Sequence, residues 1–158
     1  QYLTFLAAGE KYAIEILSIK ELIDYPKVTL VPLMQPCVEG VMNIRGSVIP
    51  VVNLSSRFGF EPNPHTKKTS IVIVETRFQE RALDIGITVD EVHDVVSINV
   101  HDIEPAPAFG ANIDIRFIEG MGKLKNALLV ILSIENLLAV DELAKLGAPY
   151  TNQTDNAG

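Results

Sequence analysis

Few residues of this chain have the types and spacing that metal binding requires. The histidines, His65, His93 and His101, form no H-x-x-x-H pattern, and the one cysteine, Cys37, cannot complete a structural zinc site. His93 alternates with apolar neighbours, which is typical of a residue on the surface of a strand. The sequence therefore predicts no metal site and no cofactor.

Signatures of catalysis are equally scarce. The run GMGK at residues 120–123 lacks the G-x-x-x-x-G-K-[ST] spacing of a phosphate-binding loop, and no G-x-S-x-G or S-x-x-K pattern occurs. Four carboxylates lie close in sequence: Asp84, Asp90, Glu91 and Asp94. Because successive residues of a strand point to opposite faces, a solvated outer face explains these carboxylates. We predict a protein that is not an enzyme and that acts through its surfaces.

Composition narrows the class of protein. The 158 residues carry a formal net charge of −7, with scattered lysines and arginines, whereas a nucleic-acid binder would need a basic surface. No apolar run approaches the roughly 18 residues that a membrane helix needs. The chain begins directly with an alternating pattern rather than a signal peptide, and a single cysteine fits a reducing compartment. These features predict a soluble cytoplasmic domain without direct membrane insertion.

Short alternating runs of apolar and polar residues predict a mainly β protein. Strands are expected at residues 3–5, 12–16, 48–54, 71–74, 83–92 and 128–134. The runs at 48–54 and 128–134 are apolar on both faces, so each is expected between two layers. Pro50 predicts an edge strand or a bulge, because proline cannot donate a ladder hydrogen bond. Helical spacing of apolar residues predicts a helix at 134–146, ending at Gly147.

An internal repeat is the most informative pattern in the sequence. Residues 38–54 (VEGVMNIRGSVIPVVNL) match residues 118–134 (IEGMGKLKNALLVILSI) at a shift of 80, which places Arg45 on Lys125. Residues 17–24 (LSIKELID) match the segment ITVDEVHD at a shift of 70. The same order of parts predicts two related halves; chance matching of apolar residues is the alternative.

Each half would hold about five short strands, enough for a small barrel. A half of this size buries only a marginal core alone, so the two are expected to pack through a shared apolar interface. We predict one domain over residues 1–147, made of two β-barrel subdomains that exchange chain near residues 60–70 and after 134. The polar residues 148–158 are expected to form a disordered tail.

The stretch GVMNIRGSVIPVVNLSSRFG closely resembles the CheW adaptor family of bacterial chemotaxis, whose hallmark is G-V-x-N-L-R-G followed by V-x-P-V-x-D-L and R-x-F. The segments LTFLAAGEKYAIEILSIKELI, LDIGITVDEVHDVVSI, IEPAPAF and FIEGMGKLKNALLVILSIENLL are similar to other ordered parts of that family. Ile44, Asn53 and Ser133 depart from its usual residues, and the hairpin TRFQERALD is longer than typical. These departures affect the expected choice of partner rather than the family.

The resemblance implies two SH3-like five-stranded barrels without catalysis. It also implies an adaptor that joins the cytoplasmic tips of methyl-accepting chemoreceptors to the regulatory domain of a chemotaxis histidine kinase, in arrays at the inner face of the membrane. Two alternatives within the family are the CheW-like domain of a larger CheV-type protein and a coupler of another chemosensory pathway. A small-molecule-binding β-barrel or an unrecognised enzyme would instead need a polar pocket with clustered ionisable groups.

The resemblance assigns receptor binding to eight residues: Ile19, Glu21, Asn43, Ile44, Arg45, Gly46, Thr88 and Val89. An apolar groove between two barrels could accept a helix, and arginine suits its rim because a guanidinium can bind a carboxylate bidentately. Ile19 and Val89 could instead be core residues, and Glu21 could be a structural hydrogen-bonding group. Gly46 is expected to supply a positive φ at a turn.

Overall fold

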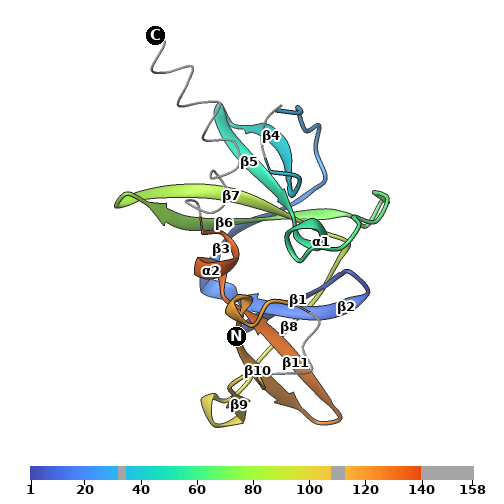
Figure 1. Ribbon diagram of the computed structural model, residues 1–158, viewed down its shortest axis with the longest axis vertical. Coiled ribbons are helices and arrows are strands. Elements are labelled where there is room, and N and C mark those ends of the chain that lie inside the picture. Colours follow the sequence, from blue (N-terminus) through green and yellow to red (C-terminus); the bar gives the residue numbers. More distant parts are fainter. Residues whose placement is uncertain (32–34, 108–112, 140–158) are drawn as a thin grey trace.

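A computed structural model gives the structure of the chain and describes residues 1–31, 35–107 and 113–139. The described residues form two sheets, with sheet B above sheet A in Figure 1. Sheet A has the strand order β8-β1-β2-β11-β10-β9 and sheet B the order β3-β6-β7-β5-β4. The predicted mainly β fold of two small barrel subdomains is confirmed, with a sixth, two-residue strand in sheet A.

The strands of sheet A are β1 (Tyr2–Ala7), β2 (Glu10–Glu15), β8 (Glu91–Val96), β9 (Ile103–Glu104), β10 (Ile118–Leu124) and β11 (Ala127–Leu132). Those of sheet B are β3 (Ile19–Asp24), β4 (Val38–Ile44), β5 (Ser47–Asn53), β6 (Ser70–Phe78) and β7 (Arg81–Val89). One-turn helices follow β5 and β11, α1 (Leu54–Arg57) and α2 (Ile134–Leu137). Short 3-10 turns lie at Ile16–Ser18, Val100–Asp102 and Ile115–Phe117. No helix within the described ranges has the length and apolar character to cross a membrane.

The two halves of the repeat do not fold separately. Strands β1 and β2 join the later strands in sheet A, whereas β6 and β7 join β3, β4 and β5 in sheet B. The chain passes from sheet A to sheet B at Ile16–Ser18 and returns to sheet A at Asp90. Near residues 60–70, a predicted point of exchange, it instead connects β5 and α1 to β6, and both of these strands belong to sheet B. Parallel pairing joins the exchanged parts, β5 with β7 and β2 with β11.

The repeat itself is confirmed by strand register. Met42 pairs with Ile49 in the β4–β5 hairpin, and Gly122 pairs with Leu129 in the β10–β11 hairpin, at the predicted shift of 80. Each hairpin has one bulge, at Glu39 in β4 and at the equivalent residue of β10. The repeated apolar pattern therefore encodes the same hairpin twice.

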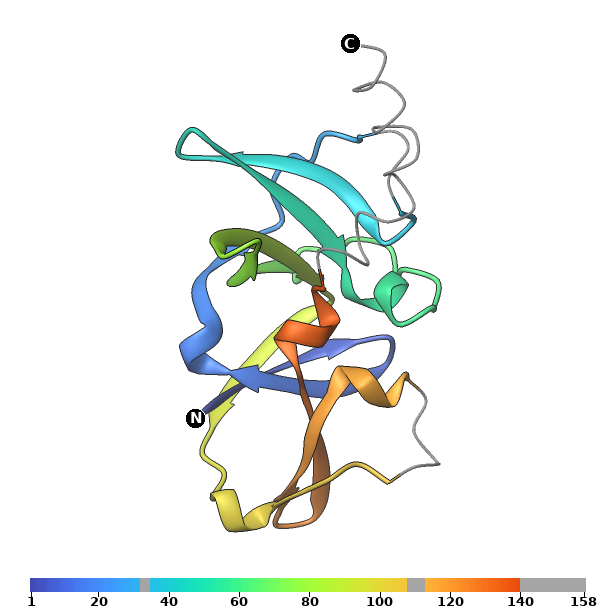
Figure 2. The ribbon, with the colours of Figure 1, turned by 60° about the vertical axis from the view of Figure 1, so that its left-hand side comes forward.

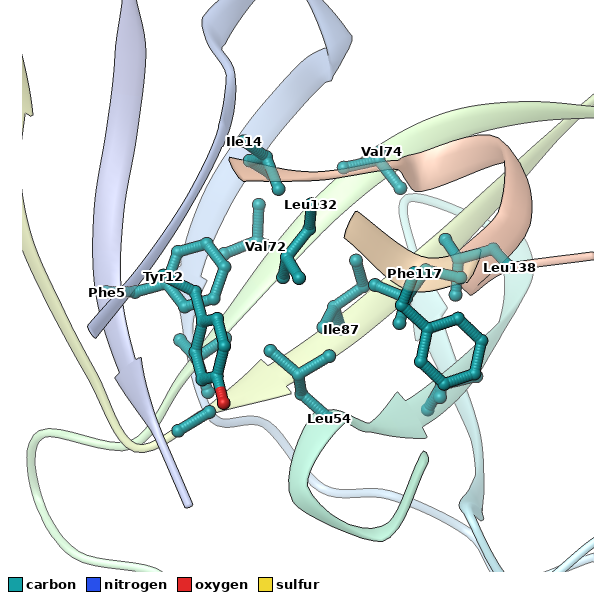
Figure 3. Packing of buried hydrophobic residues seen from close by; sticks show 14 of the residues in the cluster. Phe5, Tyr12, Ile14, Leu54, Val72, Val74, Ile87, Phe117, Leu132 and Leu138 are labelled. Atoms are coloured by element: carbon teal, nitrogen blue, oxygen red, sulfur yellow. The ribbon is translucent and has the colours of Figure 1, made fainter. Parts of the chain in front are cut away.

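The largest apolar cluster lies between the sheets, as the predicted shared interface requires (Figure 3). Phe5 and Ile14 reach it from sheet A, and Val72 and Ile87 from sheet B. Alternate residues of the same sheet B strands, such as Ile71, face a second cluster inside that barrel. Sheet A has a smaller inner cluster of its own. Strands with apolar residues on both faces thus separate a barrel interior from the shared interface.

Three expectations about β5 and its repeat require correction. β5 lies between β7 and β4, so Pro50 is not in an edge strand. Its missing N–H is tolerated because pairing with β7 starts only at Val51, and Val41, opposite Pro50, bonds through its backbone to Thr29. Val48 of β5 and Leu128 of β11 are 67% and 62% exposed, so only the later part of each strand lies between layers.

Two other predicted boundaries also differ. The expected strand at 83–92 divides at Asp90, where the chain leaves sheet B for sheet A. The expected helix at 134–146 ends at Leu137, because Leu138 leaves helical geometry with φ −111° and ψ 39°. Both leucines are fully buried, and this bend lets two consecutive side chains enter the core. The remainder of that predicted helix, from residue 140, and the predicted tail lie outside the described residues.

Candidate functional site

The tip of the β4–β5 hairpin is a tight turn with Arg45 and Gly46 at its centre. Their φ values are 50° and 86°, and positive φ at both central positions is what a type I′ hairpin turn requires. The Asn43 side-chain oxygen accepts a hydrogen bond of 3.0 Å from the Gly46 N–H, which stabilises the turn. The predicted positive φ at Gly46 is confirmed, whereas no sequence pattern indicated that Arg45 also adopts left-handed geometry.

Arg45 forms an ion pair with Glu21 of β3. Arg45 Nη1 lies 3.3 Å from Glu21 Oε2, and Nη2 contacts Oε1 more closely. The hydrogen bond from the guanidinium and its charge lower the pKa of the Glu21 carboxyl. Because β3 and β4 are at opposite ends of the strand order of sheet B, this pair joins the two edges of the barrel. The Arg45 side chain nevertheless remains 74% exposed, so donors are left for a partner.

A half-buried isoleucine lies on each of the two strands joined by this ion pair, but the two pack against different clusters. Ile44, next to Arg45, is half-buried and packs against the inner cluster of sheet B. Ile19, two residues before Glu21, is also half-buried but packs against the cluster between the sheets. The structure therefore brings Glu21, Ile44 and Arg45 together and places Ile19 at the base of the same edge strand.

Thr88 and Val89 lie elsewhere. On β6, Val89 pairs with Ser70 and Ile19 pairs with Val74. These two positions are four residues apart, about 13 Å along the strand, so Val89 lies far from Ile19. Their exposed fractions are 3% for Thr88 and 1% for Val89. Neither side chain reaches the surface in this conformation, and for Val89 the core alternative holds.

The sequence did not predict the role of Glu39. Its carboxylate, 17% exposed, accepts hydrogen bonds from Thr88 Oγ1 and from Tyr25 OH at 3.0 Å, and lies 3.2 Å from His65 Nε2. The Tyr25 and His65 rings are stacked at a tilt, with centroids 4.0 Å apart. Burial first, and then the charge and hydrogen bond of Glu39, raise the pKa of the Tyr25 phenol, which stays protonated. The only sequence signal was the alignment of Glu39 with Glu119 in the repeat.

The site is suited to recognition. Where side chains are described, no group of three or more His, Cys, Asp and Glu residues is placed to hold a metal ion. What the hairpin tip offers is an oriented guanidinium beside the half-buried Ile44, a combination that can bind carboxylates or the end of a helix and bury apolar area.

Comparison with known proteins gives a consistent result. A family model described as a CheW-like domain matches residues 1–142. The chemotaxis protein CheW of Klebsiella aerogenes is 31% identical over 144 residues, covering 91% of this chain and 84% of that protein. The crystal structure of the scaffolding protein TtCheW from Thermoanaerobacter tengcongensis superposes with a TM-score of 0.77 at 32% identity, covering 86% of this chain and 85% of that one.

A longer relative matches as well. The chemotaxis protein CheV3 of Helicobacter pylori is 29% identical over 146 residues, which cover 91% of this chain but only 45% of that protein. The same fold unit therefore occurs both alone and as part of a larger chain.

Proposed function

The chain belongs to the CheW-like domain family, and on this premise we propose that it is a noncatalytic adaptor that couples chemoreceptor tips to a chemotaxis histidine kinase. It would act in the cytoplasm, in receptor arrays at the inner face of the membrane. Similarity to a protein titled a scaffolding protein supports the adaptor role. The proposal assigns binding, and no reaction, to the described surfaces.

One observation carries the receptor half of the proposal: Arg45 is held by Glu21 at an exposed hairpin tip. An arginine already oriented by an ion pair loses less conformational entropy when it binds a partner. Ile44, the neighbouring residue, is half-buried and adds apolar area, and a helical receptor tip can lay an apolar stripe on such a surface. Receptor acidic groups or helix-end carbonyls would then meet the guanidinium.

The kinase half rests on similarity of fold. The family resemblance gives the kinase regulatory domain the same pair of barrels, so the two proteins would join barrel to barrel. Leu128, near the tip of the β10–β11 hairpin, is mostly exposed. An exposed apolar side chain at this end of the molecule, away from the Arg45 hairpin, is suited to an end-to-end contact of this kind.

The test is calorimetric titration of a receptor tip fragment and of a kinase regulatory domain into the wild type, Arg45→Glu and the matched control Lys125→Glu. We expect Arg45→Glu to weaken receptor binding at least ~100-fold, about 2.7 kcal/mol, because repulsion replaces a charged hydrogen bond. Lys125→Glu should bind the receptor like the wild type. Circular dichroism checks that each variant is folded. Wild-type receptor affinity in a folded Arg45→Glu protein would remove Arg45 from the site.

A second candidate follows from the match to CheV3, of which this chain covers less than half. The chain would then be the CheW-like part of a longer chemotaxis protein. Sequencing the full gene distinguishes the two, because an additional domain in the same reading frame would support the CheV-type protein.

A further inference from the structure

Glu39 lies at the base of the β4–β5 hairpin, at the opposite end from Arg45. It is the extra residue of the β4 bulge, between the pairs Val38–Val52 and Gly40–Val51. A bulge bends its strand and turns a side chain away from the regular alternation. Here the turned side chain is a carboxylate, and it faces hydroxyl, phenol and imidazole groups rather than water.

The three groups that contact Glu39 come from three separate segments. Thr88 belongs to β7, Tyr25 follows β3, and His65 lies in the connection between α1 and β6. Every residue of this connection from 59 to 68 is exposed, His65 included. Its further contacts are polar as well, from Asn63 to Asp90 at 2.7 Å and from Lys68 to Glu91 at 2.9 Å. One carboxylate thus ties the base of the hairpin to β7 and to two loops.

Backbone pairing attaches the hairpin to its neighbours only near this base, whereas side chains such as Ile49 and Arg45 hold it further out. β5 pairs with β7 only from Val51 to Asn53, and on its other side β4 has a single bridge, Val41 to Thr29. Beyond these pairs the hairpin extends to its tip as a two-stranded arm, visible in teal and cyan at the upper left of Figure 2. Arg45 is six residues beyond Glu39, about 20 Å along the strand, so a small rotation at the base displaces the tip considerably.

The second copy shows that the fold does not require this network. Glu119 occupies the equivalent bulge in the β10–β11 hairpin. Within the described parts of the chain no hydrogen bond to its carboxylate is found, and burial together with the charge of Glu15 raises its pKa. Glu39, in the hairpin with the Arg45 tip, has three partners instead. The network therefore belongs to the docking hairpin and not to the bulge as such.

We propose that Glu39 is a positioning residue of the receptor-docking surface: by bonding Thr88, Tyr25 and His65 it sets the direction of the β4–β5 hairpin and presents Ile44 and Arg45 preformed to the receptor. The inference rests on the proposed receptor-binding function. It would also give the buried Thr88 a part in docking through its hydrogen bond to Glu39, without contact with a partner.

The experiment uses variants that remove one hydrogen bond without changing shape. Thr88→Val replaces the buried hydroxyl with a methyl group, and Thr88→Ser keeps the hydroxyl. Glu39→Gln removes the charge of the carboxylate that contacts Thr88, Tyr25 and His65. Glu119→Gln is the matched control in the second hairpin. Each variant is measured by calorimetry against the receptor fragment and the kinase domain, by thermal unfolding, and by amide hydrogen exchange over residues 41–49.

We expect Thr88→Val and Glu39→Gln to weaken receptor binding about tenfold while kinase binding changes less than about twofold, because only the hairpin arm is released. Exchange at residues 41–49 should accelerate in both variants. Thr88→Ser and Glu119→Gln should match the wild type in both measurements. A purely structural role would instead weaken both partners in parallel with the loss of thermal stability, and that result would overturn the proposal.

Hydrogen exchange separates failure of this inference from failure of the proposed function. If the wild type binds neither partner, the adaptor function fails, and the positioning role is then decided by exchange alone. Faster exchange of residues 41–49 in Thr88→Val but not in Thr88→Ser supports positioning. Unchanged exchange in Thr88→Val contradicts it. The serine and valine variants keep the test valid if Glu39→Gln does not fold.

Discussion

The β4–β5 and β10–β11 hairpins are the same structure built twice. Their strand pairs are offset by 80 residues throughout, their bulges coincide, and each is followed by a one-turn helix. Asn53 and Ser133 cap those helices in the same way, each side-chain oxygen accepting from the backbone N–H three residues on. Apolar spacing and the bulge are thus sufficient to specify the hairpin.

The polar chemistry of the two hairpins differs at tip and base. Arg45 and Gly46 both have positive φ, whereas neither Lys125 nor Asn126 does. At the position of Asn43, the second hairpin has Lys123, which forms an ion pair of 2.7 Å with Glu104. The repeat thus preserves the hairpin scaffold, whereas the features of the proposed docking site occur in the first copy and not in the second.

The largest expected effect breaks the first hairpin at Gly40. An alanine Cβ there would lie 2.0 Å from the Thr29 carbonyl oxygen, at a φ of 150°. Relief requires breaking the two backbone hydrogen bonds between Thr29 and Val41, so Gly40→Ala should cost at least about 3 kcal/mol in urea unfolding. Gly120→Ala should cost clearly less, because the nearest atom belongs to the Ile103 side chain, which can move. Equal losses of stability in the two variants would show that the Thr29 backbone does not make Gly40 the more constrained position.

The next largest loss of stability is expected at Gly46, in the turn of the first hairpin. Gly46→Ala should lower the free energy of unfolding by about 1–2 kcal/mol, because a Cβ disfavours left-handed geometry. Asn126→Ala, in the turn without positive φ, should stay within about 0.5 kcal/mol of the wild type. Chemical denaturation of both variants measures the contrast. A loss at Asn126 as large as at Gly46 would show that the two turns are alike.

Loss of either helix cap should lower the free energy of unfolding by the same amount, because the two caps are equivalent. Asn53→Ala and Ser133→Ala each remove one side-chain acceptor at a helix start, and each should cost about 1 kcal/mol in thermal or urea unfolding. Asn53→Ser retains an acceptor and is the matched control. A much larger loss at one cap would mean that its side chain has a further role.

The smallest change in stability is expected from the titration of two carboxyls, and its dependence on pH has opposite signs at Glu21 and at Glu119. Arg45 lowers the pKa of Glu21, so this group stabilises the fold above its unfolded pKa, and the contribution is lost as pH falls. Burial and Glu15 raise the pKa of Glu119, so its contribution weakens as pH rises through the folded pKa. In an NMR titration, Arg45→Gln should raise the pKa of Glu21 and Glu15→Gln should lower that of Glu119. A shift in the other direction at either carboxyl would contradict its assigned cause.

Part of the geometry of the proposed docking site was predictable from sequence. The hallmark at residues 43–46 marked the turn, and glycine chemistry predicted its positive φ at Gly46. The partners of Glu39 were not predictable, because Tyr25, His65 and Thr88 are 14, 26 and 49 positions away and share no motif with it. Burial of Val89 was left open, since an apolar strand residue has the same sequence pattern in a core and in a groove.

Local periodicity and spacing were enough to indicate the strands β1, β2, β5, β6, β7 and β11 and the internal repeat. Three-dimensional packing was needed to show which hairpins are exchanged between the halves, that Glu21 meets Arg45, and that Glu39 joins three segments. The physical reason is that apolar faces of equivalent strands are nearly interchangeable in sequence. Which of them pair, and which polar groups then meet, is settled by closing both barrels around one shared core.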